Sequence, residues 1–367
     1  MRSCGVGEKR GQNKGPRHVR QSAGAAIRAL CQIAAMQRVV RALVGASAGL
    51  MLSACAAPGS MPGGTNWDAA GRELDGGSGS ANASSSAQKT TVANLNRILS
   101  AEQLSPVDRS LYLSIRAFLY SRLGREEDSQ KDVAEMARVN PQGWPIMMWF
   151  VMPGLAGSGD RGAALRALGY GLAQKPNDAW LLTGQGQVQL QIADYARALG
   201  TLDNAVASAN TPAERRNSAY FRGHANLALG NYDQAASDFD AAIAGQTSPK
   251  ARMLGALWRY AAQVRGRHNA QATLAKELGN ENLSEWPAPV VKFLLGRLPA
   301  GELEVAAESD DAAKKTNGKC MAAYFIGMDN IRRGDKQRAR EQLQLAQARC
   351  PTVSEYNWAA SNELKRL

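Results

Sequence analysis

The sequence has few of the residues that carry most catalytic chemistry. Its 367 residues include only three histidines, and none lies in an HExxH, GxSxG or Walker A pattern. These are His18, His224 and His268. Asp238 and Asp240 lie two residues apart in a helical stretch, on different faces, so we expect solvated surface charges there. No catalytic residue and no cofactor are predicted, and without CxxC motifs or clustered histidines no metal site is predicted.

A long apolar run is also missing. A membrane-spanning helix needs about twenty apolar residues, whereas the run at 42–54 has about thirteen. This length fits the apolar region of a secretory signal, and the basic stretch at 36–41 precedes it in the expected order. We therefore expect a signal peptide over 36–54 that starts at Met36, with residues 1–35 as a disordered upstream extension. The alternative is that 1–35 form a genuine basic, disordered tail.

A charge bias is absent from most of the chain, although the formal net charge is +12. Residues 1–54 hold nine Lys or Arg and one acid, which leaves a charge of +4 for residues 55–367. A nearly balanced body offers no electrostatic footprint for DNA or RNA, so no nucleic-acid partner is expected.

The apolar run ends in Leu52, Ser53, Ala54 and Cys55. This order resembles the lipobox of bacterial lipoproteins, in which the cysteine becomes the lipidated first residue. The resemblance implies cleavage before Cys55, acyl chains such as palmitate on it, and anchoring at the periplasmic face of a membrane. Because Ala56 follows and no Asp stands there, the resemblance implies the outer membrane. The alternative is an ordinary secretory signal with an incidental cysteine.

Residues 55–90 are rich in Gly, Ser and Ala and have little apolar periodicity. Such a segment buries too little surface to offset the entropy of ordering, so a flexible tether is predicted. A coil of this length has a reach of roughly 30 Å.

From residue 91 onward the sequence favours helices and repeats itself. Unbranched residues and Ala predominate, and aromatic residues make up only 6% of the chain. The small turn residues Gly124, Gly159, Ala193, Gly230 and Gly266 are separated by 35, 34, 37 and 36 residues. Two helices in a period near 34 residues are typical of a solenoid of helical hairpins.

Several positions in this repeat resemble the tetratricopeptide repeat (TPR) family. Small residues lie where the two helices approach closely, glycine occupies turns, and proline follows second helices. They are Gly186, Gly223, Gly327, Gly230, Gly334, Ala198, Ala235, Ala339, Pro141, Pro176 and Pro351. The resemblance implies an all-α, right-handed TPR solenoid over 91–367. Its six or seven units are expected near 110–143, 145–178, 179–210, 216–249, 252–284, a divergent 286–310 and 320–351, followed by a C-terminal helix at 352–367.

Two cysteines remain in the repeat region, Cys320 and Cys350. Cys320 lies in the first helix of the last unit and Cys350 at the end of the second, so both lie at the same end of one antiparallel hairpin. An exported protein is in an oxidising compartment, so a disulfide is predicted, with two separate buried thiols as the alternative.

The first helices of a TPR array line a concave groove, which the resemblance implies is the binding surface. Helical position nominates eight groove residues, although for each aromatic one a place in the core is the alternative. They are Trp149, Trp180, Gln187, Tyr220, His224, Tyr260, Tyr324 and Met328.

The ends of the last unit, around Cys320 and Cys350, and the segment Trp286 to Pro289 resemble the NlpI-like TPR lipoproteins. That family implies a non-enzymatic outer-membrane adaptor whose partners are periplasmic or envelope proteins such as cell-wall hydrolases and a protease. A second copy of this chain is also considered as a partner. The alternatives are a pilotin-like assembly lipoprotein for a pilus, secretin or secretion system, and a cell-wall enzyme.

Overall fold

The computed structural model describes residues 81–100, 104–157, 160–279, 284–352 and 354–367. Every regular element in these ranges is a helix. In chain order they are α3 (Ala81–Leu99), α4 (Pro106–Arg122), α5 (Glu126–Val139), α6 (Trp144–Ala156), α7 (Arg161–Gln174), α8 (Ala179–Gln191), α9 (Tyr195–Ala207), α10 (Pro212–Leu229), α11 (Tyr232–Ile243), α12 (Pro249–Arg265), α13 (Ala270–Leu278), α14 (Ala288–Leu294), α15 (Ala300–Ala306), α16 (Ala312–Arg332), α17 (Lys336–Arg349) and α18 (Glu355–Arg366). The predicted signal peptide, Cys55 and most of the tether lie outside the described residues.

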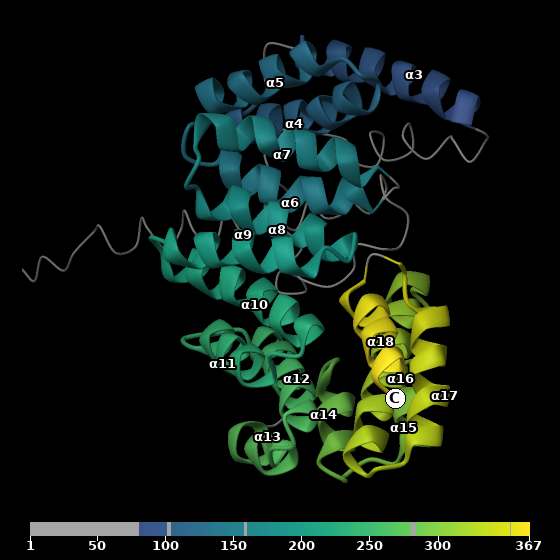
Figure 1. Ribbon diagram of the computed structural model, residues 1–367. Coiled ribbons are helices and arrows are strands. Elements are labelled where there is room, and N and C mark those ends of the chain that lie inside the picture. The colour runs from purple at the N-terminus through teal and green to yellow at the C-terminus, as the bar shows by residue number, and fades with distance from the viewer. Residues whose placement is uncertain (1–80, 101–103, 158–159, 280–283, 353) are drawn as a thin grey trace, which may run out of the picture.

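The helices form a curved row of antiparallel hairpins, an all-α TPR solenoid (Figure 1). From α4 onward each first helix packs on its own second helix and on the next hairpin. In Figure 1 the row runs from α3 down to α13 and then turns back, so that α16, α17 and α18 lie beside its middle part. The first helices, α4, α6, α8, α10, α12, α14 and α16, form what we call the inner surface of the row.

Three glycines allow the hairpins to close, as the repeat pattern predicts. A Cβ atom at Gly186 would lie 2.5 Å from Cγ of Leu202. In two other units a Cβ atom at Gly223 would lie 2.9 Å from Phe239, and one at Gly327 would lie 2.9 Å from Leu343. Each large side chain sits sixteen residues after its glycine. The absence of a side chain on the first helix therefore leaves space that a large side chain of the second helix fills.

The turns between the helices of a hairpin use left-handed backbone geometry. Gly230 has φ 89° and Gly334 has φ 78°, conformations that are relaxed only for glycine, as predicted. At the equivalent position of another unit, Ala193 adopts φ 60° without that advantage. After the turns at Ala193 and Gly334, the helices α9 and α17 are capped by the side chains of Asp194 and Asp335, which accept backbone hydrogen bonds. The first helix α10 begins with a full capping box made by Thr211 and Glu214.

The prediction of a tether as far as residue 90 is wrong at its end, because α3 already begins at Ala81. Its Val92, Leu95 and Leu99 are buried and belong to the same core as α4. This packing stabilises a helix that has little propensity advantage of its own. Thr90 donates its hydroxyl hydrogen to the carbonyl of Ser86, which is compatible with a continuous helix.

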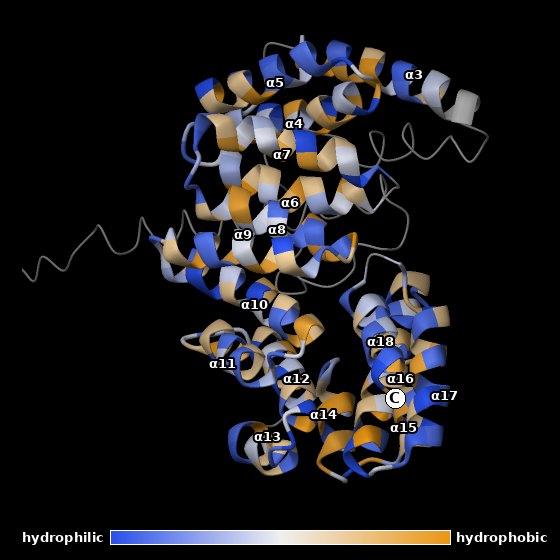
Figure 2. Cartoon of the chain, in the orientation of Figure 1, coloured by the Kyte–Doolittle hydropathy of each residue, from blue (hydrophilic) through white to orange (hydrophobic). Residues whose placement is uncertain are grey.

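Hydropathy differs strongly between α6 and α17, as Figure 2 shows. Much of α6 is coloured as hydrophobic, and its Met148, Val151 and Met152 are fully buried. A helix that is apolar around most of its circumference is covered on several sides. By contrast α17 is largely hydrophilic in Figure 2, and its buried side is a narrow stripe of Ala339, Leu343 and Ala346.

Two hairpins are closed by equivalent ion pairs that the sequence did not reveal. Arg116 Nη2 lies 2.6 Å from Asp132 Oδ1, and Arg222 Nη2 lies 2.6 Å from Asp238 Oδ1. The expectation of a solvated Asp238 is therefore wrong: its side chain is buried and also accepts a hydrogen bond from Asn226. Burial of a carboxylate is tolerated here because a guanidinium and an amide satisfy its oxygens.

The structure brings Cys320 and Cys350 to disulfide-bond distance, with 2.09 Å between the sulfur atoms. The bridge joins the first turns of α16 to the end of α17, across 30 residues of sequence. Closing a loop of this length stabilises a fold by roughly 3 kcal/mol in the chain-entropy model.

The glycine contacts give a first testable prediction. Gly186→Val places branched atoms where Leu202 already lies, so we expect the free energy of unfolding to fall by about 2–3 kcal/mol. Gly200→Ala is the matched control, because nothing lies within 4 Å of the added Cβ and the helix gains up to about 1 kcal/mol. Urea unfolding followed by circular dichroism measures both changes. Equal stability of the two variants would show that the close approach is not limiting.

Candidate functional site

The open part of the inner surface contains a pair of tryptophans. Trp149 on α6 and Trp180 on α8 have ring centroids 4.7 Å apart and an interplanar angle of 49°. Both side chains are half-buried, and so is Gln187, two turns after Trp180. We call these three residues the aromatic platform. All three were predicted from their helical positions to be groove residues.

Local sequence fixes the position of this platform. Asp178 caps α8 by accepting hydrogen bonds from the backbone of Trp180 and Leu181. Gly184 lies one turn after Trp180, and a Cβ atom there would lie 3.2 Å from Cα of Trp149. The missing side chain at Gly184 therefore lets α8 approach α6 closely enough for the two indoles to meet.

The platform retains unused hydrogen-bonding capacity. Within the described ranges nothing accepts a hydrogen bond from Nε1 of Trp149, although this atom is buried. Gln191, on the same face of α8, donates to the carbonyl of Pro153 at 3.2 Å. Large aromatic side chains that are partly exposed and keep a free donor are the kind of residue that anchors protein partners.

The other five predicted groove residues are buried, which corrects the expectation that they face an open groove. The exposed fractions are 7% for Tyr220, 1% for His224 and Tyr260, and zero for Tyr324 and Met328. Tyr260 points to the end of α16, where its hydroxyl lies 3.4 Å from Asp329. The alternative that aromatic residues at these positions belong to the core holds for this half of the inner surface.

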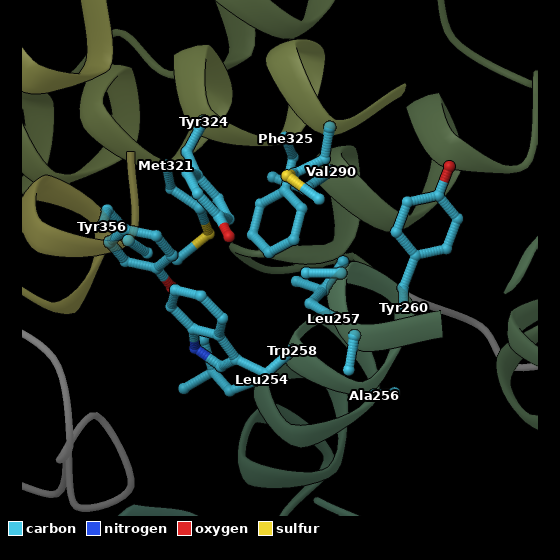
Figure 3. Packing of buried hydrophobic residues seen from close by; sticks show 14 of the residues in the cluster. Leu254, Ala256, Leu257, Trp258, Tyr260, Val290, Met321, Tyr324, Phe325 and Tyr356 are labelled. Atoms are coloured by element: carbon cyan, nitrogen blue, oxygen red, sulfur yellow. The ribbon is translucent and has the colours of Figure 1, made fainter. Parts of the chain in front are cut away.

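Helix α18 covers part of this surface, because its Trp358 lies against His224 and its Tyr356 against Tyr324. Tyr260 is instead covered where α12 packs on α16. Tyr356 of α18 stacks on Trp258 with 4.9 Å between ring centroids and 17° between planes, as Figure 3 shows. The ring centroid of Trp258 also lies 5.2 Å from that of Tyr324 and 4.4 Å from that of His224. On the α10 side, Trp358 lies 5.2 Å from the ring of His224.

Charged residues complete the contact between α18 and the inner surface. Glu363 is 1% exposed and lies 3.1 Å from Nε of Arg265 and 3.2 Å from Nη1 of Arg366. Burial raises the pKa of Glu363, and the two guanidinium groups oppose that shift. Arg366 also donates a hydrogen bond to the carbonyl of Ala228 on α10.

Sequence reasoning missed Trp258, Tyr356 and Trp358 as parts of this surface. A signal was present in α18, where Tyr356, Ala359, Ala360 and Glu363 recur at helical spacing and are all buried. That spacing predicts one covered face of the last helix, but it does not say which helices cover it.

A second recess lies at the turn side of the last units. It has a volume of about 720 Å³ and is lined by residues from α14 to α17. Its lining carries three arginines, Arg297, Arg333 and Arg338, and two acids, Asp329 and Glu341. Arg333 pairs with Asp329 at 2.7 Å, so the lining has an excess of only one positive charge, which indicates no particular ligand.

The two histidines of the repeat region lie far from any cluster of metal ligands or nucleophiles. His268 Nε2 lies 2.7 Å from Asp233 Oδ1 on the surface, whereas His224 is enclosed by aromatic rings. Among the residues with described positions, no group of three His, Cys, Asp or Glu is arranged to hold a metal ion. No helix of that same set combines the length and apolarity needed to cross a membrane.

Comparison with known proteins gives structural likeness only. No family model and no curated protein matches the chain. A TPR protein from Parabacteroides merdae is similar in structure, with 16% identity, a TM-score of 0.36, and coverage of 69% of this chain and 99% of that one. The C-terminal part of a TPR repeat-containing protein from Cytophaga hutchinsonii is similar too, with 15% identity, a TM-score of 0.33, and coverage of 74% and 94%.

The enclosure of His224 gives a testable pH dependence. Burial lowers its pKa from 6.5 to about 3, so its neutral form stabilises the fold above pH 6.5 and this contribution is lost as the pH falls toward 3. Between pH 7 and pH 5 the wild type should lose about 2 kcal/mol more free energy of unfolding than His224→Leu does. Urea titrations at both pH values measure the difference. Parallel losses in the two proteins would contradict the assignment.

Proposed function

We propose that this protein is a non-enzymatic scaffold that binds partner proteins through the inner surface of its TPR solenoid. The observation that carries the proposal is the aromatic platform, where Trp149 and Trp180 pack together yet stay partly exposed on neighbouring first helices. Solenoids of helical hairpins commonly use such extended surfaces for protein recognition. The TPR fold supports a role in protein–protein interaction, and the platform supports the place where a partner binds.

We further propose that the scaffold is anchored by lipid on Cys55 at the periplasmic face of the outer membrane. The support is the order of basic stretch, short apolar run and lipobox in residues 36–55. The cysteine pair at Cys320 and Cys350 adds to it, because disulfides persist in exported proteins and are rare in the cytosol. The partners are then envelope proteins, with cell-wall hydrolases or a protease as the specific proposal.

Crosslinking in cells tests the scaffold and its platform together. Trp149→Ala combined with Trp180→Ala removes both anchors, and loss of two buried aromatic contacts at an interface lowers affinity by at least about tenfold. We expect the yield of captured partners to fall accordingly, as measured by quantitative mass spectrometry. Val305→Ser is the control, since this apolar side chain is 72% exposed and lies on α15.

The identity of the captured proteins separates the candidate roles. Hydrolases or a protease support the adaptor, whereas secretin or pilus subunits support an assembly lipoprotein instead. Peptidoglycan cleared in a gel by the purified protein alone would overturn the non-enzymatic proposal. Partner yields that do not change in the double tryptophan variant would show that the platform is not the binding surface.

The anchor has its own test. Cys55→Ala removes the only thiol to which the lipid can attach in the proposed scheme, so we expect the protein to move from the membrane fraction to the soluble periplasmic fraction. Fractionation with immunoblotting measures this, and Cys320→Ala serves as a control for loss of a cysteine elsewhere. Retention of Cys55→Ala in the membrane would contradict lipid anchoring.

A further inference from the structure

We propose that α18 is an internal ligand of the inner surface, and that the surface it covers on α10, α12 and α16 binds an amphipathic helix of a partner protein. The partner helix carries an aromatic residue at the place of Trp358 and a carboxylate five residues later, at the place of Glu363. This inference rests on the proposed scaffold function, and it names the kind of partner that the covered half of the surface takes.

The first support is the reach of α18 along the chain. Most extensive contacts in the row join helices of the same or the adjoining unit. Helix α18 packs on α17 in that ordinary way, but it also touches α10, with Arg366 bonded to a carbonyl 138 residues earlier. It thus spans the inner surface from the last unit to a middle one, which is the position of a bound ligand rather than of one more hairpin.

The second support is the chemistry of the contact. A helix that only caps a stack needs an apolar side, but α18 brings Trp358 against His224 and Glu363 against Arg265. Glu363 and Arg366 lie one turn apart on the same side of α18, whereas Trp358, five residues before Glu363, lies on another side and meets α10. Each meets a matching group on another helix, so the surface selects an aromatic residue and a carboxylate at a fixed spacing.

The third support is that this match is incomplete. Three buried nitrogen atoms at this contact have no hydrogen-bond partner in the part of the chain that the structure describes. They are Nδ1 and Nε2 of His224 and Nε1 of Trp358. A buried polar atom left without a hydrogen-bond partner destabilises the state that contains it. A partner helix that offers a hydrogen-bonding group to His224 therefore gains over α18 at this position.

The attachment of α18 lets it leave without disturbing the last hairpin. It follows α17 after the short segment 350–354, and the end of α17 is fastened to α16 through Cys350 and Cys320. Release of α18 breaks the bonds from Asn357 to the carbonyls of Gln347 and Cys350, but the bridge keeps α16 and α17 together.

A labelled synthetic peptide of residues 354–367 tests the proposal against the full chain. In the wild type the covalently attached α18 competes at a high effective concentration, so peptide binding is weak. Arg366→Ala removes the bond to α10 and one of two partners of buried Glu363, and we expect the peptide to bind this protein at least about tenfold more tightly. Lys365→Ala is the control, since Lys365 is exposed on the same helix.

Specificity is tested in the peptide itself. The same peptide carrying Trp358→Ala should lose binding to the Arg366→Ala protein by about tenfold or more. Fluorescence anisotropy measures each affinity. A peptide that binds the variant no better than the wild type, or equally well without its tryptophan, would show that α18 is a structural cap and would overturn the proposal.

Hydrogen exchange on the wild type supplies a measurement that does not depend on a variant folding. A displaceable helix opens more easily than its neighbour, so amides of α18 should exchange at least about a hundredfold faster than those of α17. Equal protection of the two helices would contradict the proposal. If crosslinking captures partners but the peptide and exchange tests fail, the scaffold proposal stands and the internal-ligand proposal is wrong. If the peptide and exchange tests succeed but crosslinking captures no partner, α18 is an internal ligand and the scaffold proposal is wrong.

Discussion

Close approach between the two helices of each hairpin is the constraint on which the rest of the structure depends. At Gly186, Gly223 and Gly327 a missing side chain leaves room for one large residue sixteen positions later. Because the same exchange recurs in these three hairpins, their two helices approach each other equally closely, which is the basis for stacking them in one row. The regular curvature of the row, and so the existence of an inner surface, follows from that repetition.

Curvature then decides which parts of the inner surface are open. At α6 and α8 none of the described helices covers the two indoles completely, and the indoles meet there because Gly184 lets the helices touch. Farther along, the row turns back on itself and α18 meets α10. Aromatic side chains on one face of consecutive first helices therefore differ in exposure. Those of the platform are partly exposed, whereas the rings around Trp258 are buried in the core.

Local features of the fold followed from the sequence, whereas features that depend on distant segments did not. The turn glycines, the close contacts of Gly223 and the meeting of Cys320 with Cys350 are set within one unit, where spacing alone predicts geometry. The burial of Tyr324 depends on a helix that returns from the end of the chain, and no pattern within one unit reports that return. Asp238 was misjudged for a different reason: its partner Arg222 lies in the same unit but on the other helix of the hairpin, so the spacing of charges along α11 alone does not report the ion pair.

The same logic limits what the sequence says about the site. Helical position nominated Trp149, Trp180 and Gln187, and their side chains do lie partly exposed on the inner surface. It nominated His224 equally well, but only the three-dimensional path of the row shows that Trp358 covers it. A helical position identifies the residues that face inward, and the packing of the last helix decides which of them a partner can reach.

The contact between α18 and α10 also has a mechanical consequence. An open row of hairpins flexes like a coil spring, because each unit touches only its neighbours. The bond from Arg366 to Ala228 and the ion pair of Glu363 with Arg265 tie the end of the coil back to its middle. While α18 is docked, a force applied to the row is therefore expected to bend the part from α3 to α9 more than the tied segment from α10 to α18, and release of α18 removes this difference.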